Sequence, residues 1–272
     1  MKILDGRELV GFIQERQAKQ VRALRQAWNT FPKLAIIIAN DNPVIDTYVR
    51  LKRVYGEDIL VDVDVHKVAQ SEVVATIDQL NADDSVHGII VQLPLSDPTE
   101  TEAIVNRVAA SKDVDGLGED PDFVSATATA IDWLAAGYNV TLKDRAIAIV
   151  GKGRLVGAPL AKLWSTGGLH VSVYDGKTVD LQSEIRKADV IVTATGVPGL
   201  ITSQMVSAGK VVIDAGTASE DGQIVGDVAA DLRERNDLTI TPEKGGVGPL
   251  TIASLFENVI TAARSTIPAD QL

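Results

Sequence analysis

Short apolar runs alternate with segments of helical apolar spacing through the first half of the chain. Residues 7–28 place Leu9, Ile13 and Leu24 at helical intervals, whereas residues 33–39 ("KLAIIIA") form an unbroken apolar run typical of a buried strand. The same pattern predicts a helix that includes residues 46–56, a strand at 59–65, a helix at 72–80 and a strand at 86–92. This alternation is typical of βαβ units, so we expect a parallel sheet.

The alternation begins again in the second half and is typical of a Rossmann-like series. The predicted elements are a helix at 128–136, a strand at 146–150, a helix through 161–164 and strands at 170–175, 189–195 and 210–216. No internal repeat or long linker separates the halves, and the polar region 118–127 is the expected boundary. The predicted class is α/β with two domains, the second a Rossmann-like parallel-sheet nucleotide domain.

Composition narrows the class of partner. The 272 residues include 26 Lys and Arg against 37 Asp and Glu, and the net charge of -11 opposes broad binding to nucleic acid or anionic membranes. The chain has no cysteine, and its three histidines are too scattered for a metal-ligand spacing, so we expect no metal. No apolar run has transmembrane length and the N-terminal residues lack a signal-peptide core, which predicts a cytoplasmic protein with small-molecule partners.

The segment "GKGRLVG" stands where a dinucleotide loop belongs, after a predicted strand and before a predicted helix. Gly151, Gly153 and Gly157 allow backbone N–H groups to meet a pyrophosphate at the helix N-terminus, and Lys152 and Arg154 add positive charge. A plain strand-to-helix turn would need one glycine. The spacing is one residue longer than the standard fingerprint, but three glycines favour nucleotide binding.

Tyr48 and Lys52 lie one turn apart on the helix that follows the first buried strand, so they share a face. A lysine in this pattern is more often a surface residue whose stem covers apolar neighbours. If Lys52 is partly buried, desolvation lowers its pKa and lets it act as a base near neutral pH.

Two further polar residues follow predicted strands. Gln92 fits an ordinary strand end, and Asp115 of "KDVDG" fits a solvated turn. Ligands of parallel α/β sheets bind outside the carboxyl ends of the strands, which favours a ligand site for both residues.

Six ordered sequence blocks carry a family resemblance. They are "YVRLK", "GIIVQLPL", "KDVDG", "GKGRLVGAPLAKL", "VVIDAG" and "TPEKGGVGPLTIASLFEN". Between residues 36 and 258 the chain closely resembles the bifunctional methylenetetrahydrofolate dehydrogenase/cyclohydrolase family. The resemblance implies a catalytic α/β domain at 1–122, completed by a C-terminal helix at 251–272, a Rossmann-like NAD(P)-binding domain at 123–250 and an active-site cleft between them.

The resemblance also implies the chemistry. The family oxidises 5,10-methylenetetrahydrofolate to the methenyl form with a nicotinamide cofactor and hydrolyses the product to 10-formyltetrahydrofolate, in one-carbon metabolism. By motif, Lys52 is the catalytic lysine, Gln92 its polar partner, Tyr48 the ring that stacks on the aminobenzoyl group and Asp115 the carboxylate that holds the pterin. The further substrate contacts implied are Leu93, Gly245, Gly246, Gly248 and Pro249. The cofactor contacts implied are Gly151, Lys152, Gly153, Arg154, Gly157, Asp175, Lys177 and Thr217.

Two arguments about the cofactor conflict. Asp175 ends the second nucleotide-domain strand, where a carboxylate accepts hydrogen bonds from the ribose of NAD and repels a 2′-phosphate. Lys152, Arg154 and Lys177 would instead attract the phosphate, and bacterial members of the family mostly use NADP. We expect NADP, with NAD as the alternative, and a homodimer formed through the nucleotide domain, as is typical of the family.

The chain departs from the family pattern at "VSATATA" (124–130), at residues 174–176 and at Glu243 and Lys244. These departures bear on cofactor preference and relative rates. Two alternatives remain at this stage: a folate or nucleotide sensor without turnover, and another two-domain lysine-dependent dehydrogenase of the shikimate type. A sensor would not need Lys52, and the shikimate type would not explain "VQLPL" or "GGVGPLT".

Overall fold

The structure is a computed structural model that describes residues 1–220 and 223–268. The chain forms two compact units. Unit 1 combines residues 1–10 with residues 127–251, and unit 2 combines residues 11–126 with the chain from residue 252 onward. None of the helices in the described ranges is long and apolar enough to cross a membrane.

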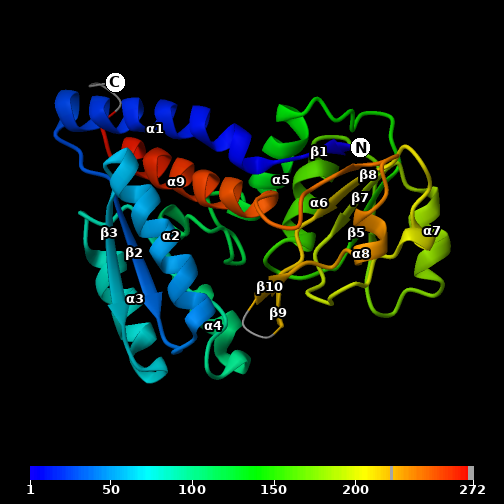
Figure 1. Ribbon diagram of the computed structural model, residues 1–272. Coiled ribbons are helices and arrows are strands. Elements are labelled where there is room, and N and C mark those ends of the chain that lie inside the picture. Colours follow the sequence, from blue (N-terminus) through cyan, green and yellow to red (C-terminus); the bar gives the residue numbers. More distant parts are fainter. Residues whose placement is uncertain (221–222, 269–272) are drawn as a thin grey trace. The chain divides into compact units, whose positions relative to one another are not determined.

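Unit 1 contains a six-stranded parallel sheet (Figure 1). Its strands, in spatial order, are β1 (Lys2–Ile3), β11 (Thr239–Ile240), β8 (Val211–Asp214), β7 (Val190–Thr193), β5 (Ile147–Val150) and β6 (Val171–Tyr174). The four apolar runs of the second half are therefore confirmed as strands. All residues of β5 and β7 are buried because helices cover both faces of the sheet.

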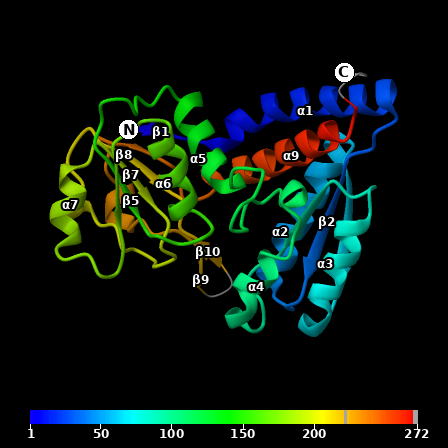
Figure 2. The same cartoon turned by 180° about the vertical axis from the view of Figure 1, so that it is seen from behind.

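The helices of unit 1 divide between the two faces of this sheet. They are α6 (Gly157–Thr166), α7 (Leu181–Lys187), α8 (Ala230–Arg233) and most of α5 (Ala126–Gly137). Ile185 of α7 and Leu232 of α8 share one apolar cluster with Ala148 and Ile191 of the sheet. α6 lies on the opposite face (Figure 2).

The N-terminal residues depart from the expected domain boundary. Lys2 and Ile3 pair in parallel with Thr239 and Ile240, so the first strand extends the sheet of unit 1. The expectation placed residues 1–122 in the other domain. A two-residue strand has no readable periodicity, and its partner lies more than 230 residues away, so only the folded chain reveals the pairing.

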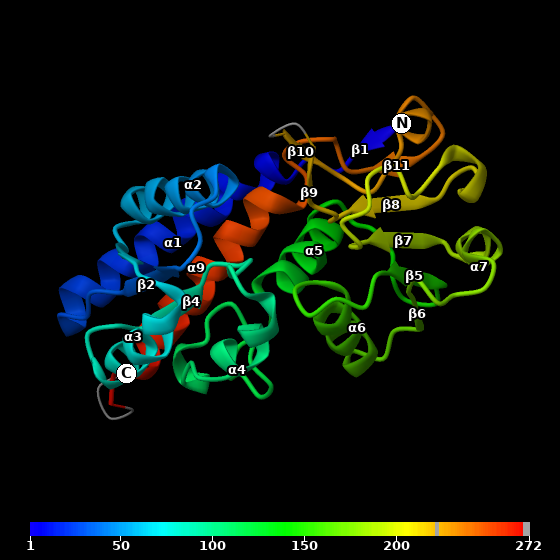
Figure 3. The ribbon, with the colours of Figure 1, turned by 90° about the horizontal axis from the view of Figure 1, so that it is seen from below.

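Unit 2 contains a three-stranded parallel sheet in the order β3 (Asp62–Lys67), β2 (Lys33–Ile38) and β4 (Gly88–Val91). Its helices are α2 (Pro43–Ile59), α3 (Val73–Ala82), α4 (Thr101–Val105) and most of α1 (Gly6–Trp28) and α9 (Val247–Ser265). α2 and α3 lie on opposite faces of the sheet (Figure 3), as right-handed crossovers in opposite directions require. Ala35 and Ile37 of β2 pack with Val73 and Ile77 of α3.

Several boundaries differ from those expected. The strand expected at 59–65 begins only at Asp62, because α2 continues to Ile59 and ends at Leu60 in the left-handed conformation (φ 66°). The C-terminal helix ends at Ser265, and residues 269–272 of the expected segment 251–272 lie outside the described residues. The elements that the sequence pattern did not predict are α7, α8, β1, β11 and the antiparallel pair β9 (Ala218–Glu220) and β10 (Gln223–Val225).

Candidate active site

α2 presents Tyr48 and Lys52 from a helix with a well-defined start. The side chain of Asn42 accepts a hydrogen bond from the backbone N–H of Val44 at 2.9 Å, and Pro43 occupies the first turn, where its missing N–H costs nothing. The buried face of the helix consists of Ile45, Val49, Tyr55, Gly56 and Ile59. Tyr48 and Lys52 are partly buried at the border of this face.

The far half of α2 is held by contacts within unit 2. The ring of Tyr55 stacks on that of Phe256, with centroids 5.2 Å apart, and its hydroxyl donates to Oε1 of Gln17 at 2.7 Å. A side chain on Gly56 would meet Val63 at 2.6 Å, so the helix approaches β3 closely at this point. These contacts fix the rotation of α2 and hence the direction of Lys52.

Lys52 is brought together with Gln92, forty residues later in the chain. The Nζ of Lys52 donates to Oε1 of Gln92 at 2.7 Å. Gln92 follows β4 directly, and its backbone N–H donates to the carbonyl of Ile37 at 2.9 Å. Its side-chain Nε2 donates to the carbonyl of Leu93 at 3.2 Å, which turns the amide oxygen toward the lysine. The lysine partner is therefore a neutral acceptor.

Lys52 and Asp115 influence each other electrostatically. Burial lowers the pKa of Lys52, and the negative charge of Asp115 opposes that shift. Burial raises the pKa of the Asp115 carboxyl, Lys52 opposes the shift and Asp113 adds to it. Within residues 1–220 and 223–268, the Asp115 carboxylate has no hydrogen-bond partner, although the side chain is only partly exposed. An unsatisfied carboxylate beside a desolvated amine is a feature typical of functional sites.

The loop that carries Asp115 is shaped by its neighbour Asp113. The buried carboxylate of Asp113 accepts hydrogen bonds from the backbone N–H groups of Gly116 at 3.1 Å, Leu117 at 3.4 Å and Gly118 at 2.7 Å. Gly116 has a φ of 67°, and a side chain there would meet the backbone of Ser125 at 2.7 Å. Asp113 thus closes the turn and leaves Asp115 available.

Lys112 anchors the same loop to α3. Its Nζ donates to the carbonyls of Leu80 at 3.0 Å, Asn81 at 2.9 Å and Asp83 at 2.7 Å. These carbonyls lie at the C-terminal end of α3, where a cation is favoured. Sequence reasoning missed the roles of Lys112 and Asp113. The signal was the juxtaposition of two aspartates in "KDVDG", of which one could serve the turn and the other a ligand.

Tyr48 lies one turn from Lys52, as the helical spacing predicted. Burial raises the pKa of its hydroxyl, so the ring remains a neutral phenol. Leu93, which follows Gln92, is also partly buried. Unit 2 therefore gathers the lysine, its amide partner, an aromatic ring and a carboxylate from the chain between residues 48 and 115.

The glycine loop of unit 1 is closely packed at both ends. Gly151 has a φ of 109°, and a side chain there would meet the carbonyl oxygen of Ala194 at 2.4 Å. A side chain on Gly157 would lie 1.9 Å from the carbonyl oxygen of Gly151. Gly153 faces open space instead. α6 begins at Gly157 without a side-chain cap. The N–H of Ala158 donates to the carbonyl of Gly153 at 3.1 Å and Pro159 has no N–H, so an anion at this helix start would meet the N–H of Gly157.

The residues expected near the cofactor ribose lie on exposed turns. Oδ1 of Asp175 accepts a hydrogen bond from the backbone N–H of Lys177 at 2.9 Å, so this carboxylate caps its own turn after β6. Lys152 and Lys177 are exposed, whereas Arg154 is partly buried. Thr217 is exposed in the chain between β8 and β9.

The second glycine-rich segment belongs to unit 1 and packs against the N-terminal residues. The carbonyl of Gly245 accepts a hydrogen bond from the N–H of Gly6 at 2.9 Å, and the Arg7 guanidinium covers Gly245, which has a φ of 93°. Gly246 packs on Thr241. Gly248 and Pro249 follow in the first turn of α9, and Glu243 and Lys244 are exposed.

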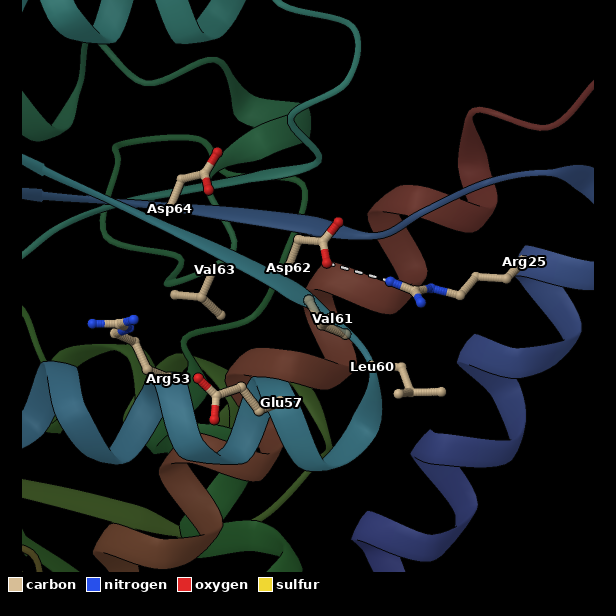
Figure 4. A pocket seen from close by; sticks show the side chains of 8 residues that line it. All are labelled: Arg25, Arg53, Glu57, Leu60, Val61, Asp62, Val63 and Asp64. Carbon is tan, nitrogen blue, oxygen red and sulfur yellow. Dashed lines mark hydrogen bonds and ion pairs between the residues drawn. The ribbon is translucent and has the colours of Figure 1, made fainter.

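A hollow of about 440 Å³ lies elsewhere in unit 2, beside Leu60–Asp64 (Figure 4). Its charged lining consists of Arg25, Arg53, Glu57, Asp62 and Asp64. Arg25 donates to Asp62 at 3.3 Å across it. The predicted site residues do not line this hollow, so it does not coincide with the candidate site.

Two sequence models of one family match the chain. The catalytic-domain model of tetrahydrofolate dehydrogenase/cyclohydrolase matches residues 4–115, and its NAD(P)-binding-domain model matches residues 125–267. The chain belongs to the tetrahydrofolate dehydrogenase/cyclohydrolase family. The resemblance seen in the sequence is confirmed, and the family differs from the shikimate-type alternative.

Relatives of the tetrahydrofolate dehydrogenase/cyclohydrolase family match along nearly the whole chain. The bifunctional protein FolD of Exiguobacterium sibiricum is 36% identical, over 96% of this chain and 99% of its own. FolD from Campylobacter jejuni, whose crystal structure is known, is also 36% identical in sequence. Its structure matches with a TM-score of 0.91, over 98% of this chain and 100% of its own. The enzyme from Trypanosoma brucei, complexed with NADP cofactor and inhibitor, is 29% identical with a TM-score of 0.90, and the match covers 98% of both chains.

The function of the protein follows from its family. It is a methylenetetrahydrofolate dehydrogenase and cyclohydrolase, and its second domain binds a nicotinamide dinucleotide. Among the described residues, no cluster of three or more histidine, cysteine, aspartate or glutamate side chains could hold a metal ion.

Proposed function

We propose that Lys52, Gln92, Tyr48 and Asp115 carry both reactions of this enzyme, the oxidation of 5,10-methylenetetrahydrofolate with NADP and the hydrolysis of the methenyl product to 10-formyltetrahydrofolate. The observation that supports this assignment best is the 2.7 Å hydrogen bond between a desolvated lysine and a neutral amide. Unit 2 is then the catalytic unit and unit 1 the nucleotide unit.

The carboxylate of Asp115 suits the pterin. The pyrimidine edge of a pterin presents adjacent N–H donors, and a carboxylate without a protein partner accepts two parallel hydrogen bonds from them. Lys112 and Asp113 hold the loop in the shape that presents this carboxylate. Tyr48, one helical turn before Lys52, stacks on the aminobenzoyl group.

Lys52 works on the one-carbon bridge. The dinucleotide supplies the hydride acceptor when bound. Loss of the hydride leaves a delocalised cation on the folate, and a neutral amine can assist attack of water on it where an ammonium ion would repel it. The lowered pKa of Lys52 provides the neutral form, and Gln92 orients the amine without adding charge. In the hydrolysis, Lys52 moves the proton released by the attacking water.

The residues of unit 1 fit a dinucleotide. Gly153 faces open space beside the uncapped N-terminus of α6, which suits a pyrophosphate. The Asp175 carboxylate is engaged by the backbone of its own turn, and Lys152 and Lys177 are exposed nearby in sequence. These features support NADP over NAD, as does the NADP complex of the Trypanosoma brucei relative. Gly245, Gly246, Gly248 and Pro249 then contact the substrate and the nicotinamide.

The working form that we propose is a homodimer in the cytoplasm. Among residues 1–220 and 223–268, β6 is the last strand of the sheet of unit 1 and pairs with β5 alone, so its outer edge carries N–H and C=O groups without a strand partner. Val173 on this strand is 38% exposed. Pairing of two such edges would cover both the backbone groups and the apolar side chain.

A spectrophotometric assay tests the proposed function. Purified enzyme with 5,10-methylenetetrahydrofolate and NADP should form methenyltetrahydrofolate, and added methenyltetrahydrofolate should disappear faster than without enzyme. Catalytic efficiency should be higher with NADP than with NAD. Folate binding without either turnover would support the sensor alternative and overturn the assignment of Lys52 as a catalytic residue.

A further inference from the structure

Asp227 is a buried carboxylate that none of the site assignments above uses. It lies between β10 and α8, and its side chain is fully inaccessible to solvent. Oδ2 accepts hydrogen bonds from the hydroxyl of Thr193 and from the backbone N–H of Thr195, both at 2.6 Å. Oδ1 accepts from the backbone N–H of Val197 at 3.1 Å. A single side chain thus holds the end of β7 and the loop that follows it.

The loop held by Asp227 contacts both other loops expected at the cofactor. A side chain on Gly151, the first glycine of the dinucleotide loop, would meet the carbonyl oxygen of Ala194 at 2.4 Å. A side chain on Gly196 would meet the carbonyl oxygen of Thr217 at 3.4 Å. The chain at 194–197 therefore lies between the loop after β5 and the loop after β8. A displacement of residues 194–197 would therefore disturb the packing of the loop after β5 and of the loop after β8.

Asp227 is itself placed by the strand end of β8. Oδ1 of Asp214 accepts hydrogen bonds from the N–H groups of Gly216 at 3.0 Å and Asp227 at 3.1 Å. Oδ2 of Asp214 pairs with the Arg233 guanidinium at 2.5 Å. A side chain on Gly216 would lie 2.1 Å from Oδ1 of Asp227, so the two segments are in direct contact. Asp227 and the loop after β8 are therefore one connected arrangement.

We propose that Asp227 is a positioning residue for the dinucleotide. Asp227 positions the dinucleotide by fixing the backbone of Thr195–Val197 between the glycine loop and Thr217. The proposal rests on the function above, in which these loops bind NADP. A carboxylate is required because both of its oxygens accept hydrogen bonds. An asparagine would turn an NH₂ group toward Val197 N–H or toward the donors at Oδ2, and two donors cannot bond to each other.

Asp227→Asn tests this proposal, because the cyclohydrolase reaction needs no dinucleotide and reports on whether the protein is folded. We expect cyclohydrolase kcat and KM close to those of the unchanged enzyme. We expect the KM for NADP, and the dissociation constant of NADP measured by titration calorimetry, to rise by roughly ten- to a hundredfold, the range for one lost charge-assisted hydrogen bond. Asp231→Asn is the matched control, since Asp231 accepts a backbone hydrogen bond from Ser203 at 3.2 Å in the same unit and is exposed.

A second variant leaves the Asp227 side chain intact. Gly216→Ala places a methyl group against Oδ1 of Asp227 and should weaken NADP binding in the same way, again with cyclohydrolase activity retained. Unchanged NADP affinity in either folded variant would overturn the proposal, as would loss of cyclohydrolase activity in both, which would make Asp227 a residue of general stability. Failure of the unchanged enzyme to reduce NADP would instead refute the proposed function.

Discussion

The Nζ of Lys52 lies 2.7 Å from Oε1 of Gln92, and this pair joins a helix to the end of a strand. An amide accepts a hydrogen bond from the amine in either protonation state, so it orients Lys52 without stabilising its charge. A carboxylate in the same place would favour the ammonium form. Because burial already lowers the pKa of Lys52, a neutral partner preserves the base near neutral pH.

Gln92→Glu should therefore favour the ammonium form of Lys52 over the neutral amine. The new negative charge raises the pKa of Lys52, so cyclohydrolase activity, which rises with pH as the amine loses its proton, should rise at a higher pH than in the unchanged enzyme. The measurement is the pH profile of cyclohydrolase kcat. Gln26→Glu on the exposed side of α1 controls for the added charge. An unshifted profile would mean that Gln92 does not govern the protonation of Lys52.

Lys52→Met keeps the bulk of the side chain and removes the base. We expect cyclohydrolase activity to fall by about 10²–10⁴-fold, the usual contribution of a general acid or base, with most dehydrogenase activity lost as well. Both rates and the circular dichroism spectrum should be measured, with exposed Lys19→Met as the control. Full rates in the folded variant would exclude Lys52 from the chemistry.

Asp115→Asn should weaken folate binding. An amide can accept at only one of its two heads, and a charge-assisted hydrogen bond contributes about 1.5–3 kcal/mol, so the dissociation constant should rise by roughly ten- to a hundredfold. Asp120→Asn, exposed a few residues later, is the matched control. Equal folate affinity in the two variants would make Asp115 an ordinary turn residue.

The same carboxyl predicts a pH dependence of substrate binding. Burial raises the pKa of Asp115 above its ordinary value of 3.8. The carboxylate is the binding form, so folate affinity should be complete well above the raised pKa and should fall as the pH decreases through it. The loss should begin at a higher pH than a solvent-exposed aspartate would give. Titration of the unchanged enzyme with folate across acid pH measures this, and Asp115→Asn should lack the transition.

Lys177→Ala tests the preference for NADP. A 2′-phosphate carries nearly two negative charges, so loss of one neighbouring cation should raise the KM for NADP severalfold and scarcely change that for NAD. Exposed Lys143→Ala in the same unit is the control. If the unchanged enzyme is more efficient with NAD, then Asp175 decides the preference despite its hydrogen bond to the turn.

Local pattern in the sequence predicted much of this protein. Apolar runs such as residues 33–38 become buried strands wherever both faces of a sheet are covered, and helical spacing places Tyr48 and Lys52 on one face regardless of the rest of the fold. The glycines of the loop at 151–157 and the ordered blocks of the family were also readable, because each depends on residues close together in the chain.

Only the tertiary structure decided which distant groups meet. Packing sets the partners of three groups of hydrogen bonds. It pairs Lys52 with Gln92, and it gives Asp113 to the turn while Asp115 stays available. It also buries Asp227 against the loop after β7. The two-residue strand β1 joins unit 1 for the same reason. A periodic pattern states which face of an element is buried, but a polar side chain acquires its role from the donors, acceptors and desolvation that the folded chain brings around it.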